Sequence, residues 1–419
     1  MNSIKNSAFT VWNYFITFLK WVIFGVIIGI VVGTVGTLFH ITLDFVTELR
    51  MENPWTIYLL PLAGLVIVFL YRKWGKKKRL DTNLILTSVR TGESLPLKMA
   101  PLIFVSTLLT HLFGGSAGRE GAALQLGGTI SQQFGRLFKF HGKKLNIATL
   151  CGMSACFSAL FGTPITATVF SMEVTSVGVM HYSALVPCAI SSVTGFYVTQ
   201  FWGIKPWLLP SIEIPDEVSA LLTFKILLLA AACAIISILF CIVLRQTGRF
   251  FNKHFKNQYF RVAVGATTVI LLYLLIGNAD YLGAGTSVIE SALLGKVFPL
   301  AFLLKIIFTA ITLKAGFKGG EIVPTLFIGA TFGCVFAGLI GLPSGFCAAI
   351  GMICLFCGVT NCPLTSLFLS IELFGADGLL WFLLAVAVSY MLSGYFGLYS
   401  KQKILYSKEF AEFIDTSAV

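Results

Sequence analysis

Charged residues are scarce in this sequence. Only 11% of its 419 residues are Asp, Glu, Lys or Arg, whereas 57% are hydrophobic. A soluble domain carries about 25% charged and about 45–50% apolar residues. The composition therefore argues against a soluble enzyme, a disordered chain and a free nucleic-acid-binding protein, and it indicates a protein that resides in a membrane.

Residues of catalytic and metal-binding chemistry are also few. The five histidines are scattered, with no H-E-x-x-H spacing and no nucleophile–base pair. Cys354 and Cys357 form a C-x-x-C pair, but no second Cys/His pair lies nearby to complete a zinc site. Gly114–Gly121 lacks the Gly-Lys-Ser/Thr of a phosphate-binding loop. We expect no metal, cofactor, nucleotide or nucleic acid, and an intramembrane enzyme stays only a remote alternative.

Long apolar runs recur along the chain, and a spanning helix needs about 20 such residues. Many runs are shorter than that, and 40 glycines interrupt them. Interrupted helices survive at membrane depth only when they are buried in protein or line a wet cavity. We therefore expect an all-α multi-pass protein of the cell membrane with tilted and broken helices. The clearest runs are Trp21–Phe39, Trp55–Tyr71, Pro101–Phe113, Ser183–Trp202, Leu221–Leu244, Val262–Ile276, Pro299–Leu313, Thr325–Ile340 and Leu379–Met391.

The formal net charge of +12 comes largely from three short basic stretches, at residues 72–79, 136–144 and 245–261. Short loops rich in Lys and Arg mark the cytoplasmic side of a membrane protein. We expect all three to face the cytoplasm, on the inner side of the bilayer.

An internal repeat runs through the sequence. Cys151–Thr175 aligns with Ile350–Phe374 without a gap, and seven of the 25 positions are identical, including a Pro and a Glu. Upstream, Gly118–Thr129 aligns with Gly319–Ala330, which again pairs two glycines and a glutamate. The same order of elements occurs twice, as in transporters whose substrate site lies between two structural repeats.

These alignments predict one transmembrane domain over residues 1–419, with a first repeat near 20–205 and a second near 220–400. Glu173 and Glu372 occupy equivalent positions at the ends of apolar runs, where polar side chains usually satisfy backbone groups of helix ends. We expect a structural role for both.

Glu120 and Glu321 are the most informative residues. Each stands among glycines directly before an apolar run. An acidic residue at membrane depth is costly, so it is a functional candidate that can take up and release protons. A glycine-rich turn that opens a helix presents backbone N–H groups and a positive helix dipole. Two such turns facing each other would bind a small anion.

These residues resemble the CLC family of chloride channels and proton-coupled anion antiporters. The family signature GREGP is present as Gly118–Ala122 (GREGA), and the signature GxFxP as Gly320–Pro324 (GEIVP). The tyrosine that closes the inner side of the CLC pathway is similar in position to Tyr399 in GLYS. The resemblance extends from about Phe24 to Tyr399.

The resemblance implies a homodimer in the lipid bilayer, with one halide pathway per subunit and two inverted repeats in each. Glu120 would be the outer gate that competes with the anion and carries a proton. No C-terminal regulatory domain is expected. The anion would be bound by Gly118, Arg119, Gly121, Ile322, Val323 and Tyr399.

Three departures from the family pattern bear on the substrate. The GSGIP signature is absent, and its nearest equivalent is Asp81–Ile85 (DTNLI), in which Thr82 or Asn83 takes the place of the anion-contacting serine. The inner proton glutamate of the chloride/proton antiporters is replaced by Val174. The GxFxP loop has gained Glu321. We expect Glu321 to pass the proton to the inside, in place of the missing inner glutamate.

These departures resemble the fluoride/proton antiporter branch of the family, and so does Gly115–Ala117 before the arginine. Ala122 and Val323 differ from that branch, where hydroxyl residues are expected. The expected function is transport of chloride or fluoride in exchange for protons, with a passive voltage-gated-type chloride channel of the same fold as the alternative.

Overall fold

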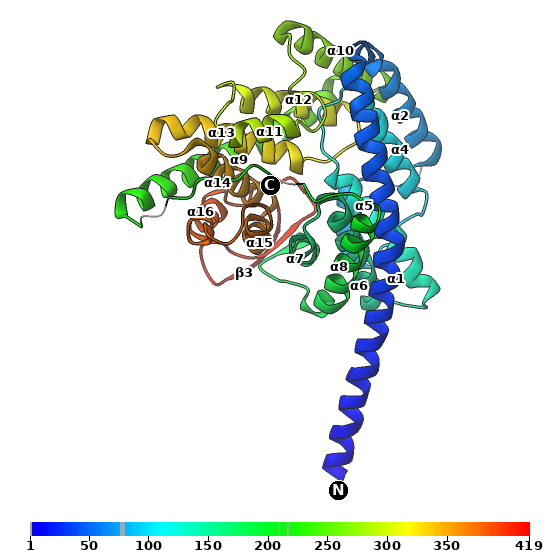
Figure 1. The fold of residues 1–419 in the computed structure, drawn as a ribbon. Coiled ribbons are helices and arrows are strands. Elements are labelled where there is room, and N and C mark those ends of the chain that lie inside the picture. Colours follow the sequence, from blue (N-terminus) through cyan, green and yellow to red (C-terminus); the bar gives the residue numbers. More distant parts are fainter. Residues whose placement is uncertain (1, 76–79, 208, 216–217) are drawn as a thin grey trace.

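The computed structural model describes residues 2–75, 80–207, 209–215 and 218–419. Residues 76–79 of the first basic stretch lie outside this part of the chain. Helices account for most of the described chain (Figure 1). They are α1 (Asn2–Glu52), η1 (Pro54–Leu59), α2 (Leu60–Trp74), α3 (Thr82–Thr91), α4 (Met99–Leu112), α5 (Glu120–Leu137), α6 (Lys143–Phe161), α7 (Pro164–Glu173), η2 (Tyr182–Ala184), α8 (Leu185–Phe201), α9 (Ala220–His254), α10 (Gln258–Ile276), α11 (Thr286–Leu293), α12 (Ala301–Ala315), α13 (Ile322–Ile340), α14 (Ser344–Thr360), α15 (Pro363–Phe374) and α16 (Leu379–Leu392).

Seven segments of the described chain have the length and hydropathy to cross a membrane: Thr10–Glu52, Pro54–Trp74, Lys143–Phe161, Tyr182–Phe201, Ala220–His254, Gln258–Ile276 and Ile322–Ile340. Others are much shorter, such as α3 and α7 with 10 residues each. A 10-residue helix rises only about 15 Å, half of the hydrocarbon thickness. The chain therefore combines long helices with short ones, as expected.

Helix α1 is the longest element and runs along one edge of the molecule, with its N-terminal part extending beyond the other helices (Figure 1). Gly29 and Gly33 lie one turn apart on the side that meets α8. A Cβ on Gly29 would collide with Thr194, and one on Gly33 would lie 2.8 Å from the Cα of Gly195. Small residues at this spacing let two membrane helices approach closely.

A close crossing of the same kind occurs once in each half of the chain, although the alignment pairs Gly329 with Gly128 and not with Gly127. Where α5 crosses α6, a Cβ on Gly127 or Gly152 would collide with the carbonyl oxygen of the other glycine. Where α13 crosses α14, Gly329 and Gly351 stand in the same relation. Glycine at these four positions allows backbone-to-backbone contact that any side chain would prevent.

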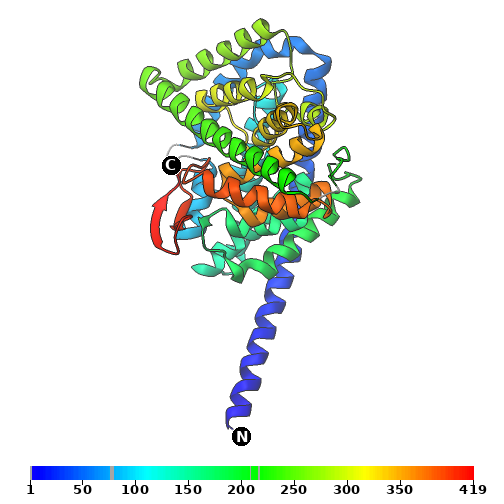
Figure 2. The same cartoon turned by 90° about the vertical axis from the view of Figure 1, so that its left-hand side faces the viewer.

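Three short strands form a small sheet in the order β1 (Ser176–Val177), β2 (Lys403–Tyr406), β3 (Phe413–Ser417). β1 pairs parallel with β2, and β2 pairs antiparallel with β3. Figure 2 shows this hairpin in red at the edge of the helical body. The end of the chain is thus ordered against the helices, which composition and helical patterning do not predict.

Lys408 anchors the hairpin to the helices. Its Nζ donates to Asn361 Oδ1 at 2.6 Å and to the carbonyl of Tyr390 at 2.8 Å. Burial lowers the pKa of Lys408 to about 8. The side chain therefore fastens the tail to the end of α14 and to α16 at a cost in desolvation.

Candidate functional site

The two glycine-rich loops predicted to face each other are hydrogen-bonded together. The N–H of Gly118 donates to the carbonyl of Gly320 at 2.8 Å, and the N–H of Gly320 donates to the carbonyl of Gly118 at 2.7 Å. This reciprocal bridge brings the start of α5 beside the start of α13. Two helix N-termini, each with N–H groups that have no acceptor within their own helix and with a positive dipole end, thus meet within the protein.

The side chain of Glu120 lies between the starts of α5 and α13. It is fully buried, and its Oε1 accepts the N–H of Val323 at 2.9 Å. Its Oε2 has no hydrogen-bond partner among the described residues. A Cβ on Gly118 or Gly320 would collide with the carboxylate, so glycine at both positions makes room for it. The carboxylate lies at the N-terminus of α13, where the N–H groups and the dipole of a helix attract negative charge.

A third helix N-terminus, that of α3, reaches the same point. Thr82 is its first residue and is buried, and its Oγ1 lies 3.2 Å from where a Cβ on Gly121 would be. The side chain of Asn83 points elsewhere, because its Oδ1 accepts the N–H of Lys401 at 3.1 Å. Of the two residues predicted to take the serine's place, the structure puts Thr82 beside α5.

Tyr399 is the remaining predicted residue of the pathway. It follows α16 and is only 3% exposed, and its buried hydroxyl has no hydrogen-bond partner in the described part of the chain. A buried hydroxyl without a protein partner is a free donor, available to an anion or to water.

Glu321 is less isolated than the sequence suggests. It directly precedes α13, and its Oε1 lies 3.8 Å from Nζ of Lys314, near the end of α12. Its side chain is 17% exposed, whereas Glu120 is fully buried. The ion pair depends on the turn between α12 and α13 and was not predicted.

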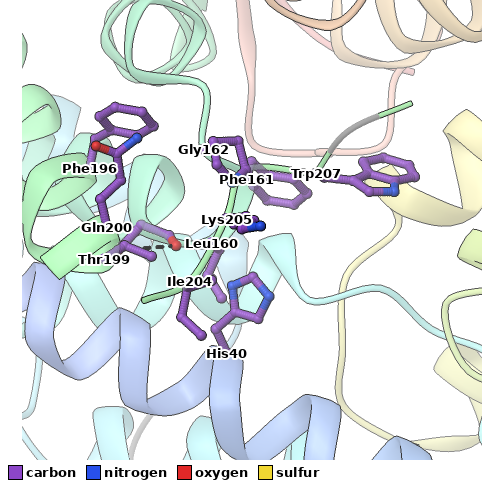
Figure 3. Close-up of a pocket in the computed structure, with 12 residues that line it drawn as sticks. His40, Leu160, Phe161, Gly162, Phe196, Thr199, Gln200, Ile204, Lys205 and Trp207 are labelled. Atoms are coloured by element: carbon purple, nitrogen blue, oxygen red, sulfur yellow. Dashed lines mark hydrogen bonds between the residues drawn. The ribbon is translucent and has the colours of Figure 1, made fainter. Parts of the chain in front are cut away.

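Arg119 points away from Glu120, although the two are adjacent in sequence. Its guanidinium lies 3.6 Å from Asp44 of α1 and 5.4 Å from the centre of the Phe161 ring. Phe161 also lines a small cavity beside His40, drawn in Figure 3, with a volume of about 10 Å³. Any contact of Arg119 with an anion would therefore involve its backbone N–H.

Glu173 and Glu372 cap helices of the opposite half. Glu173 accepts the N–H of Leu364 at 3.2 Å and that of Thr365 at 2.9 Å, at the start of α15. Glu372 accepts the N–H groups of Ile165 and Thr166 at the start of α7, both at 2.8 Å. The structural role predicted for both is confirmed, and the two contacts are reciprocal.

Hydroxyl groups add a second pair of reciprocal contacts near the bridge. Thr312 of α12 accepts the N–H of Ser116 at 3.2 Å, in the loop before Glu120. Thr110 of α4 accepts the N–H of Lys318 at 3.3 Å, in the loop before Glu321. Each loop is thus held by a helix from the other half. Isolated threonines in apolar runs give no sequence signal for this pairing.

The chain is similar to known membrane proteins over most of its length. Residues 63–394 match the family model described as voltage gated chloride channel. A chloride/fluoride channel protein of Pseudomonas syringae pv. tomato is 31% identical, over 93% of this chain and 87% of its own. A voltage-gated ClC-type chloride channel of Escherichia coli is 27% identical over 80% of this chain and 83% of its own.

Solved structures agree with these sequence matches. The crystal structure of a CLC-type fluoride/proton antiporter superposes with a TM-score of 0.87 at 31% identity, covering 92% of this chain and 98% of that one. A slow cyanobacterial Cl⁻/H⁺ antiporter at 17% identity, with a TM-score of 0.77 over 89% of this chain and 94% of its own, shares the fold. The chain therefore belongs to the voltage gated chloride channel (CLC) family of multi-pass membrane proteins.

Proposed function

We propose that this protein exchanges a halide for protons across the cell membrane, with Glu120 as the moving group. The observation that carries the proposal is the buried Glu120 carboxylate on the N–H of Val323. A carboxylate and a halide would compete for the same N–H group. Protonation of Glu120 would weaken its hold and release the site to the anion.

The anion site would be built mostly from backbone donors. The N–H groups of Gly121, Ile322 and Val323 lie at the starts of α5 and α13, and the hydroxyls of Thr82 and Tyr399 complete the set. These donors bring no formal positive charge into the site. An anion held by dipoles and hydroxyls can leave again, as transport requires.

Glu321 would take the proton between Glu120 and the inner solution. Its side chain is partly exposed, which would give it contact with water, and Lys314 would stabilise its ionised form. Val174, at the position of the missing inner glutamate, is buried and apolar and has no group that can carry a proton.

Fluoride is the substrate we favour over chloride. The support is the similarity of nearly the whole chain to a chloride/fluoride channel protein and to a CLC-type fluoride/proton antiporter. A fluoride ion holds its hydration shell tightly, so its site must offer several strong donors. A homodimer in the bilayer is the assembly that the family resemblance implies, and we carry it as part of the proposal.

Efflux from proteoliposomes loaded with equal chloride and fluoride tests the proposal, with both anions and the external pH recorded. Fluoride efflux well above chloride, together with proton uptake, is the expected result. Chloride efflux equal to or above fluoride would contradict the fluoride assignment. Halide efflux with a reversal potential that ignores the pH gradient would instead identify a passive channel.

The Glu321 step has its own test. E321Q is expected to reduce the protons moved per halide, because the amide cannot ionise. E412Q is the matched control, since Glu412 is an exposed carboxylate in the C-terminal hairpin. An E321Q protein that keeps the wild-type proton-to-halide ratio would refute this part of the mechanism.

A further inference from the structure

Gln125 is a buried amide one turn inside α5, and none of the predicted roles uses it. Its Nε2 donates to Thr82 Oγ1 at 3.1 Å. Only 3% of Gln125 is exposed, and its Oε1 has no partner among the described residues. We propose that Gln125 is a positioning residue that fixes the Thr82 hydroxyl as a hydrogen-bond donor to the halide.

The hydrogen bond from Gln125 leaves the hydrogen of the Thr82 hydroxyl available. A hydroxyl has one hydrogen to donate and two lone pairs that accept. Because the Thr82 oxygen accepts from Gln125, its own hydrogen remains available. The described residues provide no acceptor for that hydrogen, and the side chain is buried away from bulk water. A buried hydroxyl with an unused hydrogen can donate to a halide that binds and then leaves.

The Thr82 hydroxyl lies at the point where three helices begin. Thr82 Oγ1 faces the first turn of α5 at Gly121, where a Cβ would also lie 3.3 Å from the Cα of Gly320. Glu120 and Val323 meet at the same two loops. The free hydrogen of Thr82 is therefore presented at the junction where the three helices begin.

The hydrogen bond from Gln125 also strengthens the Thr82 hydroxyl as a donor. A hydroxyl whose oxygen already accepts a hydrogen bond is polarised and donates more strongly, and buried chains of this kind are cooperative. The benefit is greatest for a small anion with concentrated charge. Gln125 would thus favour fluoride more than chloride. This inference rests on the proposed function, because it needs a halide at this point.

Concentration-dependent efflux of fluoride and chloride from proteoliposomes separates KM from kcat for Q125M, Q125E and T82V. Q125M is expected to raise the KM for fluoride about fivefold, as for the loss of one ordinary hydrogen bond, and the KM for chloride less. Q125E is expected to raise the KM for fluoride and the KM for chloride more than Q125M does. Its carboxylate would accept the Thr82 hydrogen and withdraw it from the anion. T82S, which keeps the hydroxyl, should raise the KM for fluoride less than T82V does.

The double variant gives the sharpest test. If Gln125 acts through Thr82, Q125M in a T82V background has no further effect on the KM for fluoride. Q132M is the matched control, because Gln132 is a fully buried amide of the same helix that bonds Leu95 and Ser88 instead. It should lower the melting temperature and leave the KM for fluoride unchanged. Should Q125M fail to fold, Q125N repeats the test, because asparagine is too short to reach Thr82.

An unchanged KM for fluoride in a folded Gln125 variant would overturn the inference. So would effects of Q125M and T82V that multiply in full in the double variant. Neither result touches the proposed function, which fails only if the wild-type protein moves no halide or moves it without protons.

Discussion

Replacing Gly320 by alanine tests the geometry around Glu120. A Cβ on Gly320 would collide with Glu120 Oε2 and lie 2.7 Å from the backbone nitrogen of Gly121 and 2.9 Å from that of Glu120. The carboxylate could swing away, but the backbone atoms could not move without loosening the Gly118–Gly320 bridge. Overpacking of this kind costs about 1–3 kcal/mol. G320A should therefore be less stable and should hold Glu120 away from Val323.

The matched control is G338A, inside α13, the helix that follows Gly320. A Cβ there would have no atom of the described residues within 4 Å. Alanine in place of glycine inside a helix stabilises by about 0.5–1 kcal/mol, so the two substitutions should have opposite signs.

Thermal unfolding of the purified protein in detergent measures the first effect, and halide efflux from proteoliposomes measures the second. G320A should melt below the wild type and leak halide with fewer protons, because the displaced carboxylate no longer competes at the N–H of Val323. A G320A protein that melts and transports like the wild type would show that Glu120 does not pack between these glycines. The reasoning about the gate would then be wrong.

Two further substitutions test contacts that hold the halves and the tail together. E372A leaves the first N–H groups of α7 without their acceptor and should destabilise the protein by about 1 kcal/mol. E412A, in the exposed hairpin, is its control. Equal melting temperatures for the two variants would show that Glu372 does not cap α7. The lowered pKa of Lys408 means that the unfolded chain binds more protons than the native one between about pH 8 and the ordinary lysine value. The stability of the wild type relative to K408M should therefore rise as the pH increases through that range, and a difference that is constant or falls with pH would contradict the burial of this lysine.

Much of the fold could be predicted from the sequence because its signals are local. Apolar runs and scarce charge predict a helical membrane protein, and the aligned glycine motifs predict that two loops meet. The register of that meeting could not be predicted. The alignment pairs Gly118 with Gly319, whereas the hydrogen-bonded bridge joins Gly118 to Gly320. A shift of one residue changes no hydrophobic pattern, so only the packed structure reveals it.

Some residues of the candidate site could be predicted from the sequence, and others could not. Glu120 stands out in sequence because an acid in an apolar setting is rare. Gln125 and Lys314 do not, because a polar residue on a membrane helix has a meaning only when its neighbour on another helix is known. The same holds for Glu173 and Glu372, whose roles at helix ends were predicted but whose partners in the opposite half were not.

The measurement that tests the central claim most directly is proton-driven fluoride movement in proteoliposomes that contain wild-type protein or E120Q. An imposed pH gradient should drive fluoride against its own concentration gradient in the wild type. In E120Q the amide cannot carry a proton, so fluoride should only run down its gradient. Wild-type protein that never moves fluoride uphill, or E120Q that still does, would contradict the account.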